Sequence, residues 1–361
     1  MVILISEQQI KKLKINEIDW KGEFEDVKTV CLSQEAIVDY LNQVRANASK
    51  DYGKRTKFDV KMPFIHSKSA FFKDNPDATI DVQAFIERIT TPPKTIISQN
   101  SKMSKSGGKN QFVYNTGIPA FRGIVYDKEQ DKFFVINTCP GAGSCVSICY
   151  ARKGNYIQYS QAYDSFTRRL NLLLNDPTAY QTQLYNELKA RATEHKALTG
   201  YKNEVVIRWN DSGDFFTKRY VQIAKDVIKD LQASGYNVID YAYTKMADVA
   251  AAGDLGSTTF SMGANKEQTK KAQNISSQKL SLVIPKELMS GIEIHTYEGE
   301  DQYKQRVSDF FSIPVEELVT YDEFMSSPKM DYPFYNVIVT PNDGDDAAQR
   351  PDVKRILLSA H

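Results

Sequence analysis

Three of the four cysteines lie close together in the sequence, at Cys139, Cys145 and Cys149. A proline and two glycines between the first two cysteines allow the backbone to turn tightly enough for the sulfur atoms to converge on one point. Thiolates are soft ligands that favour zinc, copper(I) and iron–sulfur clusters. The spacing therefore predicts a metal centre. The alternative is that these are buried cysteines that act as small apolar residues.

Three ligands from one loop leave a coordination position open on the metal. If the metal is zinc, the fourth ligand is expected to be Cys31, His66, His295 or a water molecule. If it is a [4Fe-4S] cluster, one iron is left to bind a small molecule, as in the enzymes that cleave S-adenosylmethionine. Those enzymes usually have the pattern C-x3-C-x2-C, whereas this chain has C-x5-C-x3-C. The cluster with S-adenosylmethionine is favoured, and zinc is the alternative.

A second group of polar residues follows the apolar segment Val205–Trp209, which is predicted to be a strand. The turn after it contains Asp211, Ser212, Gly213 and Asp214. A glycine with an acidic neighbour at such a strand end is where radical enzymes bind the amino group of S-adenosylmethionine. The same residues are similar to the turn by which tRNA-guanine transglycosylases recognise a guanine-type base, while a carboxylate attacks the sugar and a deazaguanine is exchanged in.

A purely structural interpretation of this turn also exists. Asp214 or Thr217 could cap the helix that follows, because both residue types accept hydrogen bonds from free amides at a helix start. The functional interpretation takes Asp211 and Asp214 as catalytic carboxylates that orient cofactor or substrate.

Arg208, Tyr243 and Lys245 are the next candidates, near the ends of two predicted strands. Tyr243 is expected to stack on a base or cofactor, and Arg208 and Lys245 to hold anionic groups, with Lys245 part of the catalytic set. The alternative is ordinary alternation of strand side chains with an exposed lysine.

Basic residues near these motifs are the candidates for binding nucleic acid. Residues 97–110 are small, polar and basic, which predicts either a solvated loop or a mobile loop over an anionic substrate. The expected phosphate contacts are Lys102, Lys105, Lys109, Arg152 and Lys153.

The elements that must position these residues alternate between short apolar strands and helices. Strands are predicted at residues 121–126, 133–138, 205–209 and 238–243, with later ones near 258–262, 280–284 and 337–340. Helices are predicted over about 159–195, with an interruption at Asp176-Pro177, and over 218–232. This alternation predicts an α/β fold with parallel strands, as a full or partial (β/α) barrel or an open doubly wound sheet. In both, active residues gather at the carboxyl ends of the strands.

The remaining organisation follows from composition. Residues 1–95 are predicted to form a mostly helical or irregular extension, and residues 96–361 a barrel-like catalytic domain carrying the cysteine site. Lys and Arg (46) nearly balance Asp and Glu (45), so any nucleic-acid binding depends on local basic patches. The sequence has no apolar run of about 20 residues and no recognisable signal peptide, so no membrane association and a cytosolic location are expected.

Taken together, these motifs resemble the bacteriophage family named after mycobacteriophage gene product eighty-eight. The resemblance rests on residues 100–105, 138–151, 208–215 and 243–245. Asn210 stands where a histidine is expected in the second motif, and no cysteine follows Cys149, so a second metal site is not expected. The resemblance implies a phage origin and the cytoplasm of an infected host, but it brings no activity. Phage metalloenzymes outside the virion often modify nucleotides or DNA, which is an argument by association.

The favoured hypothesis is therefore a phage metalloenzyme that modifies nucleic-acid bases by chemistry like that of radical S-adenosylmethionine enzymes. One alternative is an enzyme that exchanges a deazaguanine base into DNA, with zinc as a structural staple. The other is a metal-stapled protein without catalysis that binds host machinery.

Overall fold

The chain is organised as two units, each built from three stretches of sequence. In the computed structural model, unit 1 comprises Met1–Ser98, Thr116–Ala190 and Asn210–Ser234, and unit 2 comprises Gln99–Asn115, Arg191–Trp209 and Gly235–His361. The structure describes residues 17–19, 24, 27–32, 37, 82–107, 110–152, 160–199, 204–275, 279–293, 296–331, 333–340 and 343–359. Because most of residues 1–81 lie outside this set, the predicted division at residue 95 stays a prediction.

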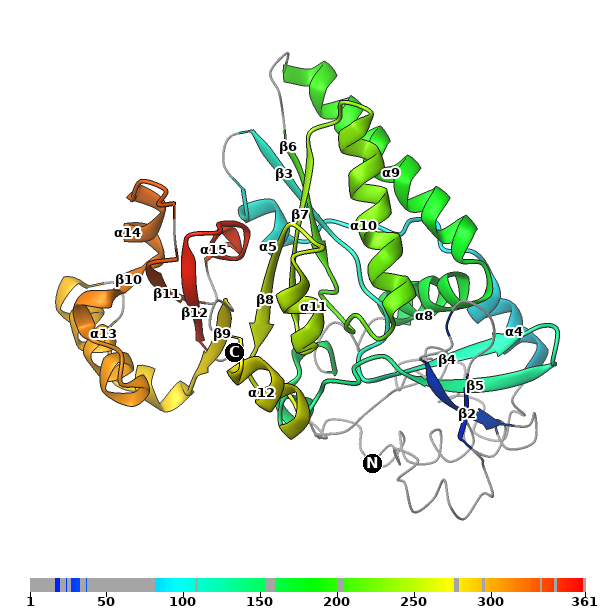
Figure 1. Ribbon diagram of the computed structural model, residues 1–361, viewed down its shortest axis with the longest axis horizontal. Helices are drawn as coiled ribbons and strands as arrows, with labels where there is room; N and C mark the ends of the chain where they lie inside the picture. Colours follow the sequence, from blue (N-terminus) through cyan, green and yellow to red (C-terminus); the bar gives the residue numbers. More distant parts are fainter. Residues whose placement is uncertain are drawn as a thin grey trace, which may run out of the picture. The chain divides into compact units, whose positions relative to one another are not determined.

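Unit 2 contains an eight-stranded sheet in which every neighbouring pair is parallel (Figure 1). Its strands are β3 (Gln111–Asn115), β6 (Glu204–Trp209), β7 (Val238–Thr244), β8 (Ser257–Ser261), β9 (Leu280–Ile284), β10 (Leu318–Thr320), β11 (Tyr335–Val339) and β12 (Val353–Ser359). They lie in the order β10-β11-β12-β9-β8-β7-β6-β3. The predicted α/β class and parallel strands are confirmed. Among the described residues, β3 and β10 each pair with one strand, so no observed pairing closes a barrel.

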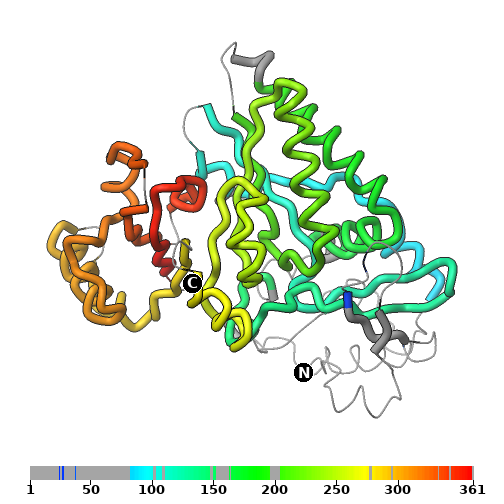
Figure 2. The backbone as a smooth tube through the Cα atoms, in the orientation of Figure 1, coloured from blue at the N-terminus to red at the C-terminus, as the bar shows by residue number. Residues whose placement is uncertain are grey.

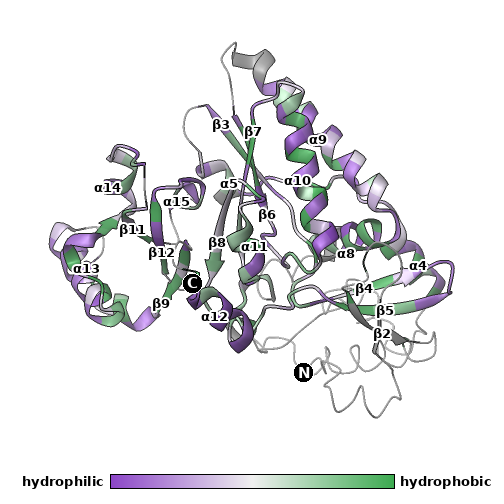
Figure 3. Ribbon diagram, viewed as in Figure 1, coloured by the Kyte–Doolittle hydropathy of each residue, from purple (hydrophilic) through white to green (hydrophobic). Residues whose placement is uncertain are grey.

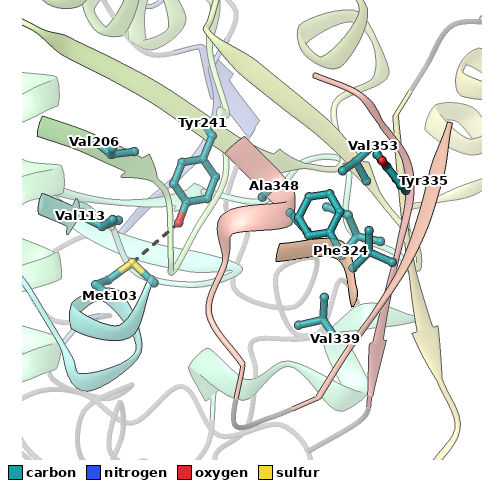
Figure 4. Close-up of a cluster of buried hydrophobic side chains, with 12 residues drawn as sticks. Met103, Val113, Val206, Tyr241, Phe324, Tyr335, Val339, Ala348 and Val353 are labelled. Carbon is teal, nitrogen blue, oxygen red and sulfur yellow. Dashed lines mark hydrogen bonds between the residues drawn. The ribbon is translucent and has the colours of Figure 1, made fainter. Parts of the chain in front are cut away.

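Apolar side chains on one face of this sheet form a continuous core. Val206 of β6, Tyr241 of β7 and Val353 of β12 belong to it, together with Ala348 and Phe324 from two short helices (Figure 4). Strands buried on both faces are expected to be almost continuously apolar, as Val205–Trp209 is. The helices of unit 2 are α5 (Ser101–Lys105), α11 (Ala247–Ala252), α12 (Lys266–Gln273), α13 (Tyr297–Phe311), α14 (Tyr321–Ser326) and α15 (Asp346–Gln349).

Unit 1 contains a separate four-stranded antiparallel sheet. Its order is β1 (Glu17–Asp19), β2 (Lys28–Leu32), β5 (Lys132–Asn137) and β4 (Arg122–Asp127). Strands were predicted close to the positions of β4 and β5, but their expected place in the parallel sheet is wrong. The turn between them is too short for the crossover that parallel strands need, so it can join only a hairpin. Asp127 Oδ1 accepts Glu129 N at 2.9 Å within that turn.

The helices of unit 1 follow the predicted pattern closely. They are α4 (Val82–Thr90), α6 (Cys145–Ile148), α8 (Ser160–Asn175), α9 (Pro177–Thr199, whose end from Arg191 belongs to unit 2) and α10 (Lys218–Ala233), and their paths can be followed in Figure 2. The predicted interruption at Asp176-Pro177 is confirmed, because Asp176 Oδ1 accepts Ala179 N at 2.9 Å and proline begins α9. Residues 37–41, whose apolar spacing also predicts a helix, are described only at Ile37.

Two side-chain interactions fix α8 and α10 within unit 1. Asn171 of α8 donates to Ile124 O at 2.9 Å and accepts from Tyr126 N at 3.0 Å, so it binds the backbone of β4. Helix α10 has separate apolar and polar stripes (Figure 3), and Tyr220 on its apolar stripe packs edge-on against Tyr180 of α9 at 6.2 Å. Both contacts brace the segments that carry the candidate site.

No helix in the described part of the chain is both long enough and apolar enough to cross a lipid bilayer.

Candidate functional site

The turn after β6 lies against the segment that follows β3. Strands β3 and β6 are paired up to Asn115 and Arg208. Beyond them, in unit 1, Asp211 N donates to Thr116 O and Ile118 N donates to Ser212 O, each at 3.0 Å. The turn formed by residues 210–216, called here the aspartate turn, is therefore held by backbone hydrogen bonds.

The close approach of the aspartate turn to the segment after β3 requires glycine at two positions. Gly213 has a φ of +82°, and a Cβ atom there would overlap the side chain of Ile118. A Cβ atom at Gly117 would overlap Asp211 Oδ1 and lie 2.9 Å from Phe166 Cε1. The Asp211 carboxylate consequently sits directly over the backbone of Gly117.

The two carboxylates of the aspartate turn are buried, and neither is needed to cap helix α10. Asp211 and Asp214 are each 4% exposed. The cap is Thr217, whose side chain accepts Arg219 N at 3.2 Å, while Asp214 Oδ1 accepts Phe215 N at 2.7 Å. Of the two capping residues considered from the sequence, the threonine takes the role.

Arg169 of α8 is a buried cation behind the aspartate turn that the sequence did not reveal. It is 3% exposed, and its guanidinium donates to Thr95 O at 3.1 Å and Gly117 O at 3.5 Å. Burial lowers the pKa of Arg169, and the nearby negative charge of Asp211 opposes that shift. The arginine thus offsets the charge of a buried carboxylate, a role that no local sequence pattern indicates.

Asn210 opens the aspartate turn in the left-handed conformation, with a φ of +54°. Its Oδ1 accepts the hydroxyl of Tyr220 at 3.0 Å. Burial raises the pKa of Tyr220 well above its ordinary value, so this hydroxyl stays protonated and donates. The Asn210 Nδ2, at the other end of the amide, has no hydrogen-bond partner among the described residues.

The cysteine segment, residues 139–149, is flanked by two residues that form hydrogen bonds with the aspartate turn. Asp214 N donates to Thr138 O at 3.0 Å, just before Cys139. At the other end, the Tyr150 hydroxyl donates to Asp211 O. The two motifs are therefore in contact. They are not loops of neighbouring barrel strands, because β5 belongs to the antiparallel sheet.

The three cysteines of this segment are partly exposed, and none of them forms a disulfide. Cys139 Sγ accepts Phe121 N at 3.2 Å, the kind of contact that tunes metal-bound thiolates, and Cys145 begins the short helix α6. Within the described ranges, no three His, Cys, Asp or Glu side chains gather closely enough to hold a metal ion. The sulfur atoms therefore do not converge here. The side chains of the possible fourth ligands, Cys31, His66 and His295, lie outside the described residues.

In unit 2, Arg208 already has an internal carboxylate partner. It forms an ion pair with Asp345 at 2.6 Å and lies 5.4 Å from the ring centre of Tyr243. Asp345 also accepts the Tyr241 hydroxyl at 3.4 Å, and its amide donates to Ser106 Oγ at 2.8 Å. Sequence reasoning missed Asp345, although the acidic, glycine-containing segment after β11 was a signal for a strand-end loop.

The other basic candidates are only partly described. Lys245 Nζ donates to Ser261 Oγ at 3.1 Å. The predicted loop 97–110 contains helix α5, because Met103 is buried in the core and Asn100 Oδ1 accepts its amide at 2.9 Å. Lys105 is exposed. The remaining predicted phosphate contacts lie outside the described side chains: Lys102, Lys109, Arg152 and Lys153.

Comparison with known proteins places the chain in a family. The family described as Gene product 88 matches residues 95–314, more than half of the 361 residues, and the match spans the cysteine segment, the aspartate turn and Lys245. No curated protein and no solved structure matches the chain. The chain is a member of the Gene product 88 family.

Proposed function

We propose that this protein is a bacteriophage metalloenzyme that modifies bases of nucleic acid, with its centre at the cysteine segment and the aspartate turn. The single observation that carries the proposal is the double contact between these segments. The turn binds the cysteine segment through Asp214 N to Thr138 O and through Tyr150 to Asp211 O. The buried carboxylates of the aspartate turn are thus held next to the segment that carries the three thiols.

The favoured group is a [4Fe-4S] cluster with S-adenosylmethionine, held by Cys139, Cys145 and Cys149. When bound, it would supply the electron for reductive cleavage of S-adenosylmethionine. The chemistry of the donors fits it, since all three are soft thiols, and Cys139 accepts a backbone N–H. The three sulfur atoms lie too far apart in this structure to bind the cluster together.

The residues of the aspartate turn would bind and orient. The Asp211 carboxylate, buried beside Arg169, is suited to an amino group of the cofactor or an exocyclic amine of a base. Ser212 and Gly213 would let the backbone approach the cofactor. The Asn210 amide, fixed by Tyr220, presents an N–H donor to an acceptor atom of the ligand.

Nucleic acid is the proposed substrate because of the phage family and the basic side chains near the motifs. Lys105 is exposed and would meet backbone phosphates together with Lys102, Lys109, Arg152 and Lys153.

The test is reductive cleavage of S-adenosylmethionine by the full chain. The protein is purified without oxygen, reconstituted with iron and sulfide, reduced with dithionite, and assayed for 5′-deoxyadenosine with and without DNA. We expect product from the wild type, more of it with DNA, and none from Cys145→Ala. Asp211→Asn should lower the rate by about tenfold or more, because a hydrogen bond to a charged group is lost.

The matched control is Ser144→Ala, since Ser144 is exposed and its side chain makes no capping hydrogen bond to α6. It should retain wild-type activity. A reconstituted wild type that forms no 5′-deoxyadenosine, or a Cys145→Ala variant that forms as much, would rule the proposed reaction out.

No structural observation favours the base-exchange alternative. Incorporation of labelled deazaguanine into duplex DNA, lost in Asp211→Ala, would establish that alternative instead.

A further inference from the structure

Polar side chains form a row across three neighbouring strands of unit 2, at the carboxyl ends of β7 and β8 and near the start of β9. Ser261 of β8 pairs in register with Ser281 of β9, and Lys245, just after β7, donates to Ser261 Oγ at 3.1 Å. One row earlier, Tyr243 of β7 pairs with Thr259 of β8. Strands inside a parallel sheet are normally apolar on both faces, so a polar row here requires a reason.

Two other polar side chains near this row, Lys279 and Ser257, have a structural role. Lys279 Nζ donates to Ser257 Oγ at 3.2 Å, to Ala348 O at 2.8 Å and to Arg350 O at 2.9 Å. Ser257 also donates to Ala348 O at 2.7 Å. These two side chains satisfy carbonyl groups at the end of α15, where a helix leaves its last acceptors without partners.

Thr259 and Ser281 have no such explanation. They are 0% and 1% exposed, and neither hydroxyl has a hydrogen-bond partner among the described residues. A buried hydroxyl without a partner costs folding free energy, and native proteins rarely keep one unless water or a ligand satisfies it. Two of them on adjacent strands indicate a place for a molecule with several acceptor atoms.

The charge of the row selects the class of that molecule. Lys245 contributes an ammonium group, and Ser261, already bonded to it, can donate its own hydroxyl proton onward. Asp345 forms an ion pair with Arg208 at 2.6 Å, so the negative charge of this carboxylate is already balanced. Lys245 and Ser261 lie at the carboxyl ends of β7 and β8, and ligands of open α/β sheets bind outside such strand ends.

We propose that Lys245, Ser261 and Ser281, supported by Thr259, form a subsite for an oxyanion, either a carboxylate or a phosphate group of a ligand. The ammonium group neutralises the anion, and the hydroxyls donate to its oxygen atoms. The subsite goes beyond the proposed reaction, since it needs no metal in the cysteine segment.

The experiment measures binding of inorganic phosphate and of acetate to the full chain by titration calorimetry, at constant ionic strength. Saturable binding of at least one anion is expected for the wild type, and the preferred anion distinguishes a phosphate from a carboxylate ligand. Lys245→Met and Ser281→Ala should each weaken that binding by about tenfold or more, because each removes a donor to the anion. Lys270→Met, which removes an exposed lysine of α12, is the control and should bind as the wild type does.

A second measurement uses the nearly isosteric variant Thr259→Val and the variant Ser281→Ala without any anion. Both should unfold at the same temperature as the wild type or higher, because each removes a buried hydroxyl that lacks a partner. The proposal is overturned if neither anion binds the wild type, or if binding survives in both Lys245→Met and Ser281→Ala. It is also overturned if both hydroxyl variants lower the unfolding temperature, since the hydroxyls are then satisfied within the protein.

Discussion

At the scale of single residues, the site depends on the buried Asp211 carboxylate, which fits only because a neighbouring position is a glycine. The Asp211 carboxylate lies against a position where any side chain would collide with it, namely Gly117. The positive charge of Arg169 offsets the negative charge of the Asp211 carboxylate. A carboxylate held in this way has little freedom to turn, which is what a group that orients a ligand requires.

Gly117→Ala should lower the free energy of unfolding by about 1–3 kcal/mol, because the added methyl group overlaps the Asp211 side chain and forces a shift. The measurement is urea denaturation of a double-mutant cycle. In an Asp211→Ala background the same change should cost less, whereas Gly235→Ala, whose added Cβ meets nothing, should cost the same in both backgrounds. Strict additivity of Gly117→Ala and Asp211→Ala would contradict the proposed contact.

Lys279 gives a pH dependence that can be assigned to one group. Burial lowers the pKa of Lys279 from 10.5 to about 7. Above pH 7 the unfolded chain therefore holds a proton that the folded chain has lost, so stability rises with pH. Relative to Lys279→Met, the wild type should gain about 1.4 kcal/mol per pH unit from about pH 7 to about pH 9. Denaturation curves across that range measure it, and parallel profiles for the two proteins would disprove it.

At the scale of elements, the cysteine segment is a connection that is hydrogen-bonded to the aspartate turn at both of its ends. It leaves the antiparallel hairpin through Thr138 and leads toward α8, and the aspartate turn contacts it at each end. The two motifs therefore meet through hydrogen bonds between loops, without belonging to adjacent strands of one sheet.

Tyr150→Phe tests this arrangement, because it removes the hydrogen bond to Asp211 O and keeps the ring. We expect a loss of about 1 kcal/mol in stability and faster loss of bound metal to a chelator, since one end of the segment is released. Tyr297→Phe is the control, as Tyr297 is 82% exposed. Equal rates of metal loss in the two variants would mean that the contact does not hold the segment.

The sequence predicted the elements better than their pairing. Helices α8, α9 and α10 and the break at Asp176-Pro177 were predictable from apolar periodicity and a local capping signal. The antiparallel pairing of β4 and β5 follows from the short turn between them, which the alternation of strands and helices alone does not take into account. The partners of Arg169 and Asp345 could not be predicted, because each acts on a residue more than forty positions away.

At the scale of the whole molecule, both units are built from interleaved stretches of the chain. The parallel sheet takes β3 and β6 from two separate stretches and its remaining strands from residues after Gly235. Family membership covers residues 95–314 and so includes parts of all of these stretches. A division of the chain anywhere between β3 and β12 therefore separates strands of this sheet.

A fragment of residues 235–361 should consequently fail to form a soluble monomer. It lacks β6, so β7 becomes an edge strand, and apolar residues such as Tyr241 lose Val206 as a packing partner. Size-exclusion chromatography of the fragment should show aggregate, while the full chain elutes as a single defined species. A monomeric, folded fragment would contradict this account of the sheet.

The central claim, that Cys139, Cys145 and Cys149 hold a metal centre, is tested most directly by metal analysis of the full chain purified without oxygen. The account predicts about four irons per chain with matching sulfide and a broad absorption near 400 nm. The iron should be lost in Cys145→Ala and kept in Ser144→Ala. One zinc in place of iron would keep the thiolate site but exclude the radical reaction. A wild type without bound metal, or a Cys145→Ala variant with as much metal as the wild type, would contradict the claim itself.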